Sequence, residues 1–378
     1  MQQRSENIFL MKSGKNNMLD LRHYIPILKW KRAEEGALKA LGEDQKKYIT
    51  PLIQFVMPKN KAGETIENVV TEFEKKLPQL PKKLIESWGI NSVFIDVSLL
   101  YTPSLKAKSI KNILLGGYNL GGVFIPVIYL DDDQKIKDAA CSAAKEAKSG
   151  ICLRLICPNF SDLTKLNQDI DNLLSYYRLM EKDVDLLVDI KETEYNNSKY
   201  IKYLNLSQSI PNLSKWRTFI FASGSFPKNL SKCKIDEENL IPRIDWKSWK
   251  EQINYKKIKR KPSFADYTIQ YPIYEEVTQF YPPTSSIKYA LENDWLIMKG
   301  QREKYEDYLA NANLLVKDKR YYGKNFSYGD EYVAEKAKHF AVYIKNPLVK
   351  GTGTTETWLR AGINHHLVLV AHQVANLF

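Results

Sequence analysis

Eight short apolar segments alternate along the chain with segments of helical periodicity, and this alternation limits the possible folds more than any other feature. Stretches such as RAEEGALKAL and TIENVVTEFEKKL separate most of them, with apolar residues three or four positions apart. Strands that alternate with helices form parallel sheets, and eight strands close a barrel. The sequence therefore predicts an α/β fold, a (β/α)8 TIM-barrel-like parallel barrel. The eight segments are YIPILKW (24–30), ITPLIQFV (49–56), SVFIDVS (92–98), VFIPVIYL (123–130), GICLRLIC (150–157), DLLVDIK (185–191), TFIFASGS (218–225) and FADYTIQY (264–271).

The alternation ends near residue 272, where a strand-like SIKYALENDWLIMKG and a helical REKYEDYLANANLLV follow. A chain of 378 residues can hold one such barrel and an appendage. We expect an N-terminal arm (1–22), the barrel (23–271) and a C-terminal α+β extension that packs on the barrel (272–378). We interpret the many tyrosines of the extension as packing residues rather than as base-stacking residues.

The composition, 44% hydrophobic and 26% charged, is that of an ordinary globular protein and excludes a disordered chain. No apolar run reaches the roughly 18 residues that cross a membrane, and the N-terminus lacks the apolar stretch of a signal peptide. We expect a soluble cytoplasmic protein without a membrane partner. The cysteines lack CxxC spacing, so buried free thiols are expected rather than a zinc site or disulfides. They are Cys141, Cys152, Cys157 and Cys233.

The chain has 56 Lys and Arg against 44 Asp and Glu, a formal net charge of +12. Such an excess is compatible with nucleic acid or an acidic protein as a partner. Most of the lysines, however, stand beside acidic residues at helical spacing, which is typical of a solvated face. The densest basic run, KKIKRK (256–261), precedes a proline and is expected in a loop. Nucleic-acid contact is the weaker interpretation.

Polar residues late in the expected strands are the main candidates for a functional site. Each is an even number of positions from an apolar residue of its own strand, that is, it shares parity with it. Side chains with the same parity lie on the same face of a strand. The carboxyl ends of the strands form the active face of a (β/α)8 barrel, so these residues could meet in one pocket. The alternative is that they are ordinary strand-end residues, satisfied by loop backbone or by one another. The residues with this parity are Lys29, Asp96, Arg154, Asp189, Lys191, Ser223 and Ser225.

The segment GTGTTETWLRAGINHH is expected to begin a helix, with Thr354 or Thr355 as its N-cap. We predict that this helix covers the mouth of the barrel and brings Arg360 and a histidine towards Asp189 or Asp266. The alternative is structural: Trp358 packs, Arg360 pairs with Asp330 or Glu331, and the histidines are satisfied core residues.

The hypothetical catalytic pocket consists of Asp96, Arg154, Asp189, Lys191, Asp266, His365 and His366, and the candidate binding residues are Lys29, Lys31, Ser225, Arg243, Lys288, Asp330, Trp358 and Arg360. No P-loop, zincin, hydrolase-elbow or EF-hand motif occurs. Adjacent residues such as His365 and His366 point about 100° apart on a helix, so they cannot face one metal. No metal site and no cofactor are predicted.

Several strings resemble the motifs of the bacterial and phage Beta protein family. The most specific are SIKYALENDWLIMKG, YYGKNFSYGDEYVAEKA and TTETWLRAGINHH, and the resemblance covers essentially the whole chain. It implies a role in a satellite-phage defence cassette of three genes, Gop–Beta–Cll, in which the Beta component counteracts a host-killing partner. It also implies the barrel fold. No catalytic residues come with the resemblance.

Two hypotheses of different classes follow. In the first, the chain is an interaction protein that binds and restrains a toxic companion protein from the same cassette. The product of the third gene of the cassette is a further expected partner. In the second, it is a barrel enzyme that acts on a phosphorylated or nucleic-acid substrate at the predicted pocket. Metal-assisted phosphodiester cleavage is the narrowest form of the second hypothesis, and Mg²⁺ enters only there. The sequence leaves open whether the chain is catalytic.

Overall fold

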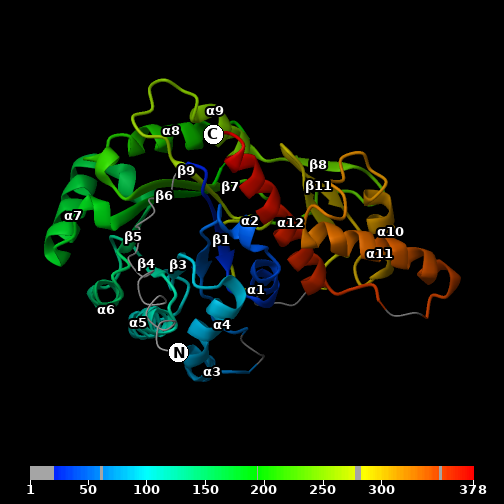
Figure 1. The fold of residues 1–378 in the computed structure, drawn as a ribbon, viewed down its shortest axis with the longest axis horizontal. Coiled ribbons are helices and arrows are strands. Elements are labelled where there is room, and N and C mark those ends of the chain that lie inside the picture. The colour runs from blue at the N-terminus through cyan, green and yellow to red at the C-terminus, as the bar shows by residue number, and fades with distance from the viewer. Residues whose placement is uncertain (1–20, 60–62, 194, 277–281, 349–350) are drawn as a thin grey trace, which may run out of the picture.

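In a computed structural model that describes residues 21–59, 63–193, 195–276, 282–348 and 351–378, all eight predicted segments form strands of one closed parallel barrel. The predicted (β/α)8-like barrel is confirmed (Figure 1). Most of the predicted N-terminal arm lies outside the described residues. The barrel strands, in order, are β1 (Tyr24–Lys29), β2 (Leu52–Gln54), β3 (Val93–Asp96), β4 (Phe124–Ile128), β5 (Ile151–Ile156), β6 (Val184–Glu192), β7 (Thr218–Gly224) and β9 (Ser263–Asp266).

Helices surround the barrel on its outside (Figure 1). Several begin where the sequence supplies a side-chain cap: the Thr65 hydroxyl accepts the backbone N–H of Asn68, and Asp162 accepts that of Thr164. The helices are α1 (Arg32–Lys39), α2 (Glu43–Lys46), α3 (Ile66–Lys76), α4 (Leu80–Trp88), α5 (Pro103–Asn119), α6 (Gln134–Ala147), α7 (Leu163–Tyr177), α8 (Ser198–Ser207) and α9 (Ile244–Gln252), with short 3-10 turns η1 (Leu77–Gln79), η2 (Cys157–Ser161), η3 (Glu181–Asp183) and η4 (Leu213–Lys215).

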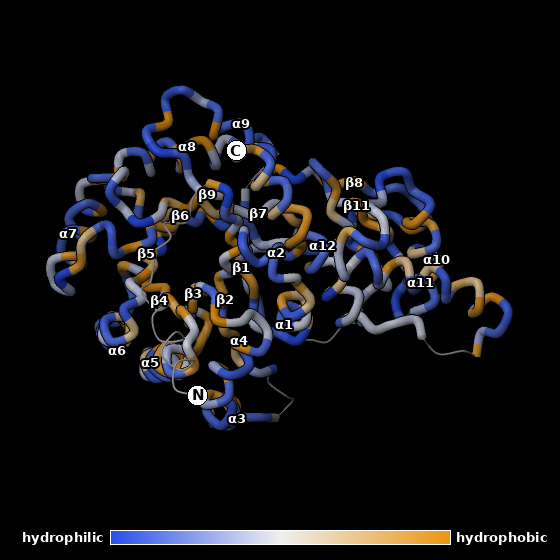
Figure 2. The backbone as a smooth tube through the Cα atoms, viewed as in Figure 1, coloured by the Kyte–Doolittle hydropathy of each residue, from blue (hydrophilic) through white to orange (hydrophobic). Residues whose placement is uncertain are grey.

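Two apolar layers hold the barrel together. Side chains such as Ile27, Phe94, Leu187 and Ala265 fill the interior, and the alternate residues of the same strands pack outwards against the helices. Figure 2 shows the strands of the barrel as largely hydrophobic for this reason. Because both faces are buried, each strand is a nearly continuous apolar run rather than a clean alternation.

The appendage lies beside the barrel and contains a three-stranded antiparallel sheet in the order β10-β11-β8, covered by two helices (Figure 1). One of its strands, β8, comes from the connection between β7 and α9, which the sequence analysis did not foresee. The core of the appendage includes Tyr289, Leu296, Tyr308 and Leu315. Its elements are β8 (Asn239–Pro242), β10 (Ile287–Ala290), β11 (Asp294–Met298), α10 (Glu306–Leu315) and α11 (Tyr328–Lys345).

The last helix, α12 (Thr355–Ala375), lies between barrel and appendage (Figure 1). Thr354 is its N-cap, as predicted, and accepts the N–H of Thr357. The Asn364 side chain donates to Ala37 O of α1 at 3.0 Å, so the helix packs beside α1 on the outer wall. This is the place of the last helix in a (β/α)8 barrel. The prediction that α12 covers the mouth is therefore wrong, whereas the predicted approach of one of its histidines to Asp266 is found, with His366 Nε2 2.8 Å from Asp266 Oδ2.

Three of the four cysteines are buried free thiols, as predicted, and Cys157 is a free thiol that is partly exposed. The basic run 256–261 lies in a loop, as predicted. Within the described ranges, no helix has both the length and the apolar character needed to cross a membrane.

Candidate active site

Inside the barrel, one arginine bridges two aspartates from neighbouring parts of the wall. The Arg154 guanidinium, on β5, lies 2.5 Å from Asp96 Oδ2 at the end of β3 and 2.6 Å from Asp189 Oδ2 on β6. All three side chains are fully buried. The predicted convergence of these three residues at the carboxyl ends of the strands is found in the structure.

Two tyrosines and a glutamine complete this network. Tyr267 donates to Asp189 Oδ2 at 2.7 Å and accepts from the same guanidinium at 2.7 Å. Tyr129 and Gln54 donate to Asp96 Oδ2 at 3.0 and 3.1 Å. Each of the two carboxylates thus accepts hydrogen bonds from several donors. The network forms a rigid polar layer across the barrel at the carboxyl ends of its strands.

Sequence reasoning missed Gln54, Tyr129 and Tyr267. Tyr129 and Tyr267 stand just beyond their strands, two residues after the inward-facing Val127 and Ala265. Both tyrosines lie within the predicted segments 123–130 and 264–271, so the parity argument would have found them if it had been applied to tyrosines as well as to charged residues and serines.

The network is strongly charged. Burial alone would raise the pKa of Asp189, but Lys191, Arg154 and the hydrogen bond from Tyr267 outweigh it and hold this pKa well below its usual range. Burial raises the pKa of Tyr267 and Tyr129, so both phenols stay protonated and act as donors. The Asp189 carboxylate is therefore ionised and accepts hydrogen bonds from Arg154 and Tyr267.

Two lysines lie at the mouth above this layer. Lys191, whose backbone is left-handed with a φ of 59°, places Nζ 3.0 Å from Asp189 Oδ2 and 3.0 Å from the Tyr267 hydroxyl. Its side chain is 33% exposed, so solvent reaches it. Lys29 Nζ donates to Tyr271 O at 3.2 Å, and burial, with the nearby cations, lowers its pKa to about 8. The mouth thus presents two amines above the buried network of Arg154, Asp96 and Asp189.

Asp266 does not join this pocket, so that prediction is wrong. Its neighbours Ala265 and Tyr267 face the barrel interior, which turns Asp266 to the outer wall. There it accepts hydrogen bonds from the Tyr24 hydroxyl at 2.5 Å and from His366 Nε2 at 2.8 Å. Asp266 fastens α12 to the barrel.

Ser223 and Ser225 also face outwards, against the predicted inward parity. Ile220 and Ala222 face the interior of the barrel, whereas Phe221, which shares parity with both serines, packs towards the helices. Ser225 Oγ donates to Asp245 Oδ1 at 2.8 Å outside the barrel.

His365 and His366 are buried and hydrogen-bonded, in agreement with the structural alternative. His365 Nδ1 lies 2.8 Å from Asp330 Oδ2, and its Nε2 lies 2.8 Å from Ala290 O. The Tyr289 hydroxyl also donates to Asp330, at 2.7 Å. Together the two histidines connect α12 to the appendage on one side and to the barrel on the other.

The remaining candidates have structural partners. Arg243 Nη1 donates to Leu291 O at 2.9 Å, and Trp358 stacks on Tyr308 with ring centroids 4.9 Å apart. Arg360 pairs with Glu356 at 2.9 Å, so the expected pair with Asp330 or Glu331 is wrong. Lys31 and Lys288 line a pocket beside the mouth.

The residues of the mouth do not fit a divalent metal. The carboxylates of Asp96 and Asp189 are already bound by the Arg154 guanidinium, which places a permanent positive charge where the ion would need its ligands. Within the described ranges, no group of three His, Cys, Asp or Glu side chains is placed to hold a metal. The Mg²⁺ form of the enzyme hypothesis has no ligand set here.

The fold and this site define a (β/α)8-barrel protein with a charged network at the carboxyl ends of its strands. The sequence model of the Beta protein family matches residues 24–372, and the chain belongs to that family. No curated protein matches the chain.

Proposed function

We propose that the chain is an enzyme that acts on a small anionic substrate at the mouth of the barrel. The observation that carries this proposal is Lys191: its amine is reachable by solvent yet held at 3.0 Å by Asp189 and Tyr267. A fixed ammonium at the carboxyl ends of barrel strands is placed as substrate-binding groups are in this fold.

The two mouth lysines support different roles. Burial and Arg154 lower the pKa of Lys191, although Asp189 opposes this, and the ammonium form of Lys191 would bind the substrate. Lys29, with a pKa of about 8, can take up and release a proton near neutral pH, as a general acid or base must. The Arg154 layer underneath would keep both amines in place without meeting the substrate.

A thermal-shift screen tests this proposal with a panel of sugar phosphates, nucleotides and dicarboxylates. At least one compound should raise the melting temperature of the wild-type chain, and Lys191→Met should remove most of that shift. Lys82→Met, on the exposed surface of α4, is the matched control and should behave as wild type. A shift that survives in Lys191→Met, or a panel without any hit, contradicts the proposal.

A second candidate function is restraint of the toxic companion protein of the defence cassette, in the cytoplasm. The observation that favours it is the C-terminal end of α11 and the turn after it, where Val342, Ile344 and Leu348 are exposed and Leu348 is 90% exposed. This end projects from the appendage, and Figure 2 shows hydrophobic residues on it. Exposed apolar side chains grouped in this way are typical of protein-interaction surfaces.

Co-expression with the companion genes tests the second candidate. The tagged chain should co-elute with the toxic protein and protect the cells, and Ile344→Asp with Leu348→Asp should abolish both effects. Ile66→Asp, an exposed apolar position on α3, is the control and should leave both effects intact. Protection of cells without any complex would contradict restraint by binding and would favour an enzymatic route.

A further inference from the structure

A pocket of about 270 Å³ lies beside the mouth, between the loops that follow β1, β7 and β9 and the appendage. Lys31 and Glu34 line it from the first loop and α1, Lys228 from the second loop, and Gln270 from the third. Lys288 of β10 lines it from the appendage. The pocket is thus built by segments that are far apart in sequence.

Glu34 is the unusual member of this pocket. Its residue is only 1% exposed, and its Oε1 accepts a hydrogen bond from Gln270 Nε2 at 2.5 Å. Its Oε2 is buried and has no hydrogen-bond partner among the described residues. Burial raises the pKa of this carboxyl group. A buried carboxyl oxygen without a partner costs stability, so a ligand group that can share a proton with it would be favoured there.

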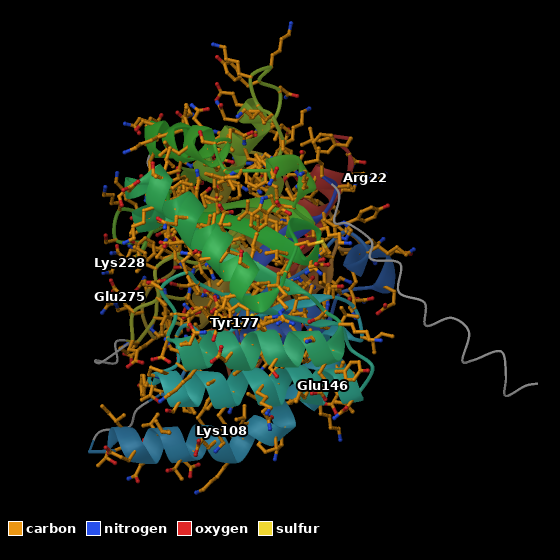
Figure 3. The ribbon with its side chains drawn as sticks, turned by 90° about the vertical axis from the view of Figure 1, so that its left-hand side faces the viewer. Arg22, Lys108, Glu146, Tyr177, Lys228 and Glu275 are labelled. Atoms are coloured by element: carbon orange, nitrogen blue, oxygen red, sulfur yellow. The ribbon has the colours of Figure 1, made fainter. Side chains whose placement is uncertain are left out.

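The three lysines make the pocket positive. Lys288 Nζ lies over the Phe226 ring, 4.7 Å from its centroid, and burial lowers the pKa of Lys288 to about 8. Lys228 pairs with Glu275 at 2.7 Å near the surface, where Figure 3 shows the two side chains together. Lys31 Nζ lies 5.1 Å from the centre of the Tyr274 ring.

We propose that this pocket binds the phosphate group of a small phosphomonoester. Three amines from three segments suit a tetrahedral anion that presents oxygens in several directions. Glu34 Oε2 would share a proton with one of these oxygens. The loops after the seventh and eighth barrel strands are where (β/α)8 barrels frequently bind phosphate, and β9 is the eighth strand here.

This inference rests on the proposed function and gives its anionic substrate a chemical class. Tyr271 connects the two places: it lines the pocket, and its carbonyl oxygen accepts the hydrogen bond from Lys29 of the mouth. A phosphate in the pocket would therefore leave the rest of the substrate near the mouth lysines. The small volume suits a phosphate and a few further atoms rather than a whole nucleotide.

Isothermal titration of the full chain with inorganic phosphate and with glycerol 3-phosphate tests the inference, with glycerol as the uncharged control. Both anions should bind, and the ester should bind more tightly. Lys288→Met should weaken both by about tenfold or more, because one charge-assisted hydrogen bond is lost. Lys288→Arg should restore most of the affinity. Glu34→Gln should keep it, because an amide can still donate to a phosphate oxygen.

Several outcomes would overturn the inference. Affinity that is unchanged in Lys288→Met, or lost in Glu34→Gln, contradicts phosphate in this pocket. Phosphate binding that depends on Lys191 and not on Lys288 moves the anion to the mouth, which overturns the inference while the proposed function stands. Lack of saturable binding up to about 10 mM also overturns it. If Lys288→Met fails to fold by circular dichroism, Lys31→Met replaces it with the same expected loss.

Discussion

Three aspartates at strand ends have the same local structure but belong to two different regions. In each, Oδ1 accepts the backbone N–H two residues later: Ser98 for Asp96, Lys191 for Asp189 and Thr268 for Asp266. Asp96 and Asp189 point into the barrel, whereas Asp266 points to the outer wall. A shift of one position along a strand therefore decides whether such a carboxylate joins the network around Arg154 or binds a helix on the outer wall.

The partners show what each region does. The inner pair shares one permanently charged guanidinium and lies under Lys191, whose amine solvent can reach. The outer Asp266 is held by Tyr24 and by His366 of the last helix, all buried. We therefore expect the inner region to govern both stability and ligand binding, and the outer region to govern stability alone.

The largest effect is expected from Arg154→Met. It leaves Asp96 and Asp189 as uncompensated charges inside the barrel, which should lower the free energy of unfolding by about 4 kcal/mol. Urea unfolding followed by circular dichroism measures the change. Adding Asp96→Asn and Asp189→Asn to this variant should recover part of the loss. An Arg154→Met variant as stable as wild type would show that the network around Arg154 does not stabilise the barrel.

Asp266→Asn is the matched change in the outer region. The amide keeps the shape but loses the charge that His366 and Tyr24 contact, so we expect a loss of about 2 kcal/mol in unfolding free energy. Ligand-induced shifts in melting temperature should stay as in wild type, because this side chain does not reach the mouth. Weaker ligand binding in this variant would show that the outer region also affects the mouth, which contradicts the distinction between the two regions.

The outer region should also respond to pH. Burial lowers the pKa of His366, although Asp266 opposes this, so the unfolded chain binds the proton more readily than the folded chain. The contribution of His366 is then complete above about pH 6.5, the value for a free histidine, and is lost as the pH falls through the folded pKa. The stability advantage of wild type over His366→Gln should shrink between about pH 7.5 and pH 5.

Unfolding free energies of both proteins across this range measure that advantage. Burial raises the pKa of Asp245 to about 6, and Asp266 interacts with both Asp245 and His366, so the difference reports the His366–Asp266 pair rather than the histidine alone. The exposed His372→Gln provides the control and should show no such trend. A constant difference from pH 7.5 to pH 5 would contradict the assignment.

The smallest effects are expected from the two serines at the end of β7, Ser223 within the strand and Ser225 just after it. Ser225→Ala removes the hydrogen bond to Asp245 and should cost about 1 kcal/mol. Ser223→Ala replaces a buried hydroxyl that has no partner among the described residues, so it should be neutral within about 0.5 kcal/mol or slightly stabilising. Thermal unfolding compares the two, and equal losses would mean that Ser223 has a polar role.

The candidate site could be predicted only in part, and the errors have one cause. Asp96, Arg154 and Asp189 were placed correctly because they share parity with Phe94, Cys152 and Leu187, which face the barrel interior in the structure. Asp266 and Ser223 were misplaced because strands buried on both faces carry apolar residues at every position. In such strands, composition does not distinguish the inner face from the outer face.

By itself, the sequence determined the eight strands, their helical connections and hence the parallel barrel, because these patterns depend on residues close together in the chain. Only the tertiary structure decided which side each polar residue faces, that β8 joins the appendage, and that α12 lies along the outer wall beside α1. It also brought Glu34 and Lys288, which are more than two hundred positions apart, into one pocket. Those outcomes depend on how the barrel closes and on what covers each face, which no local pattern encodes.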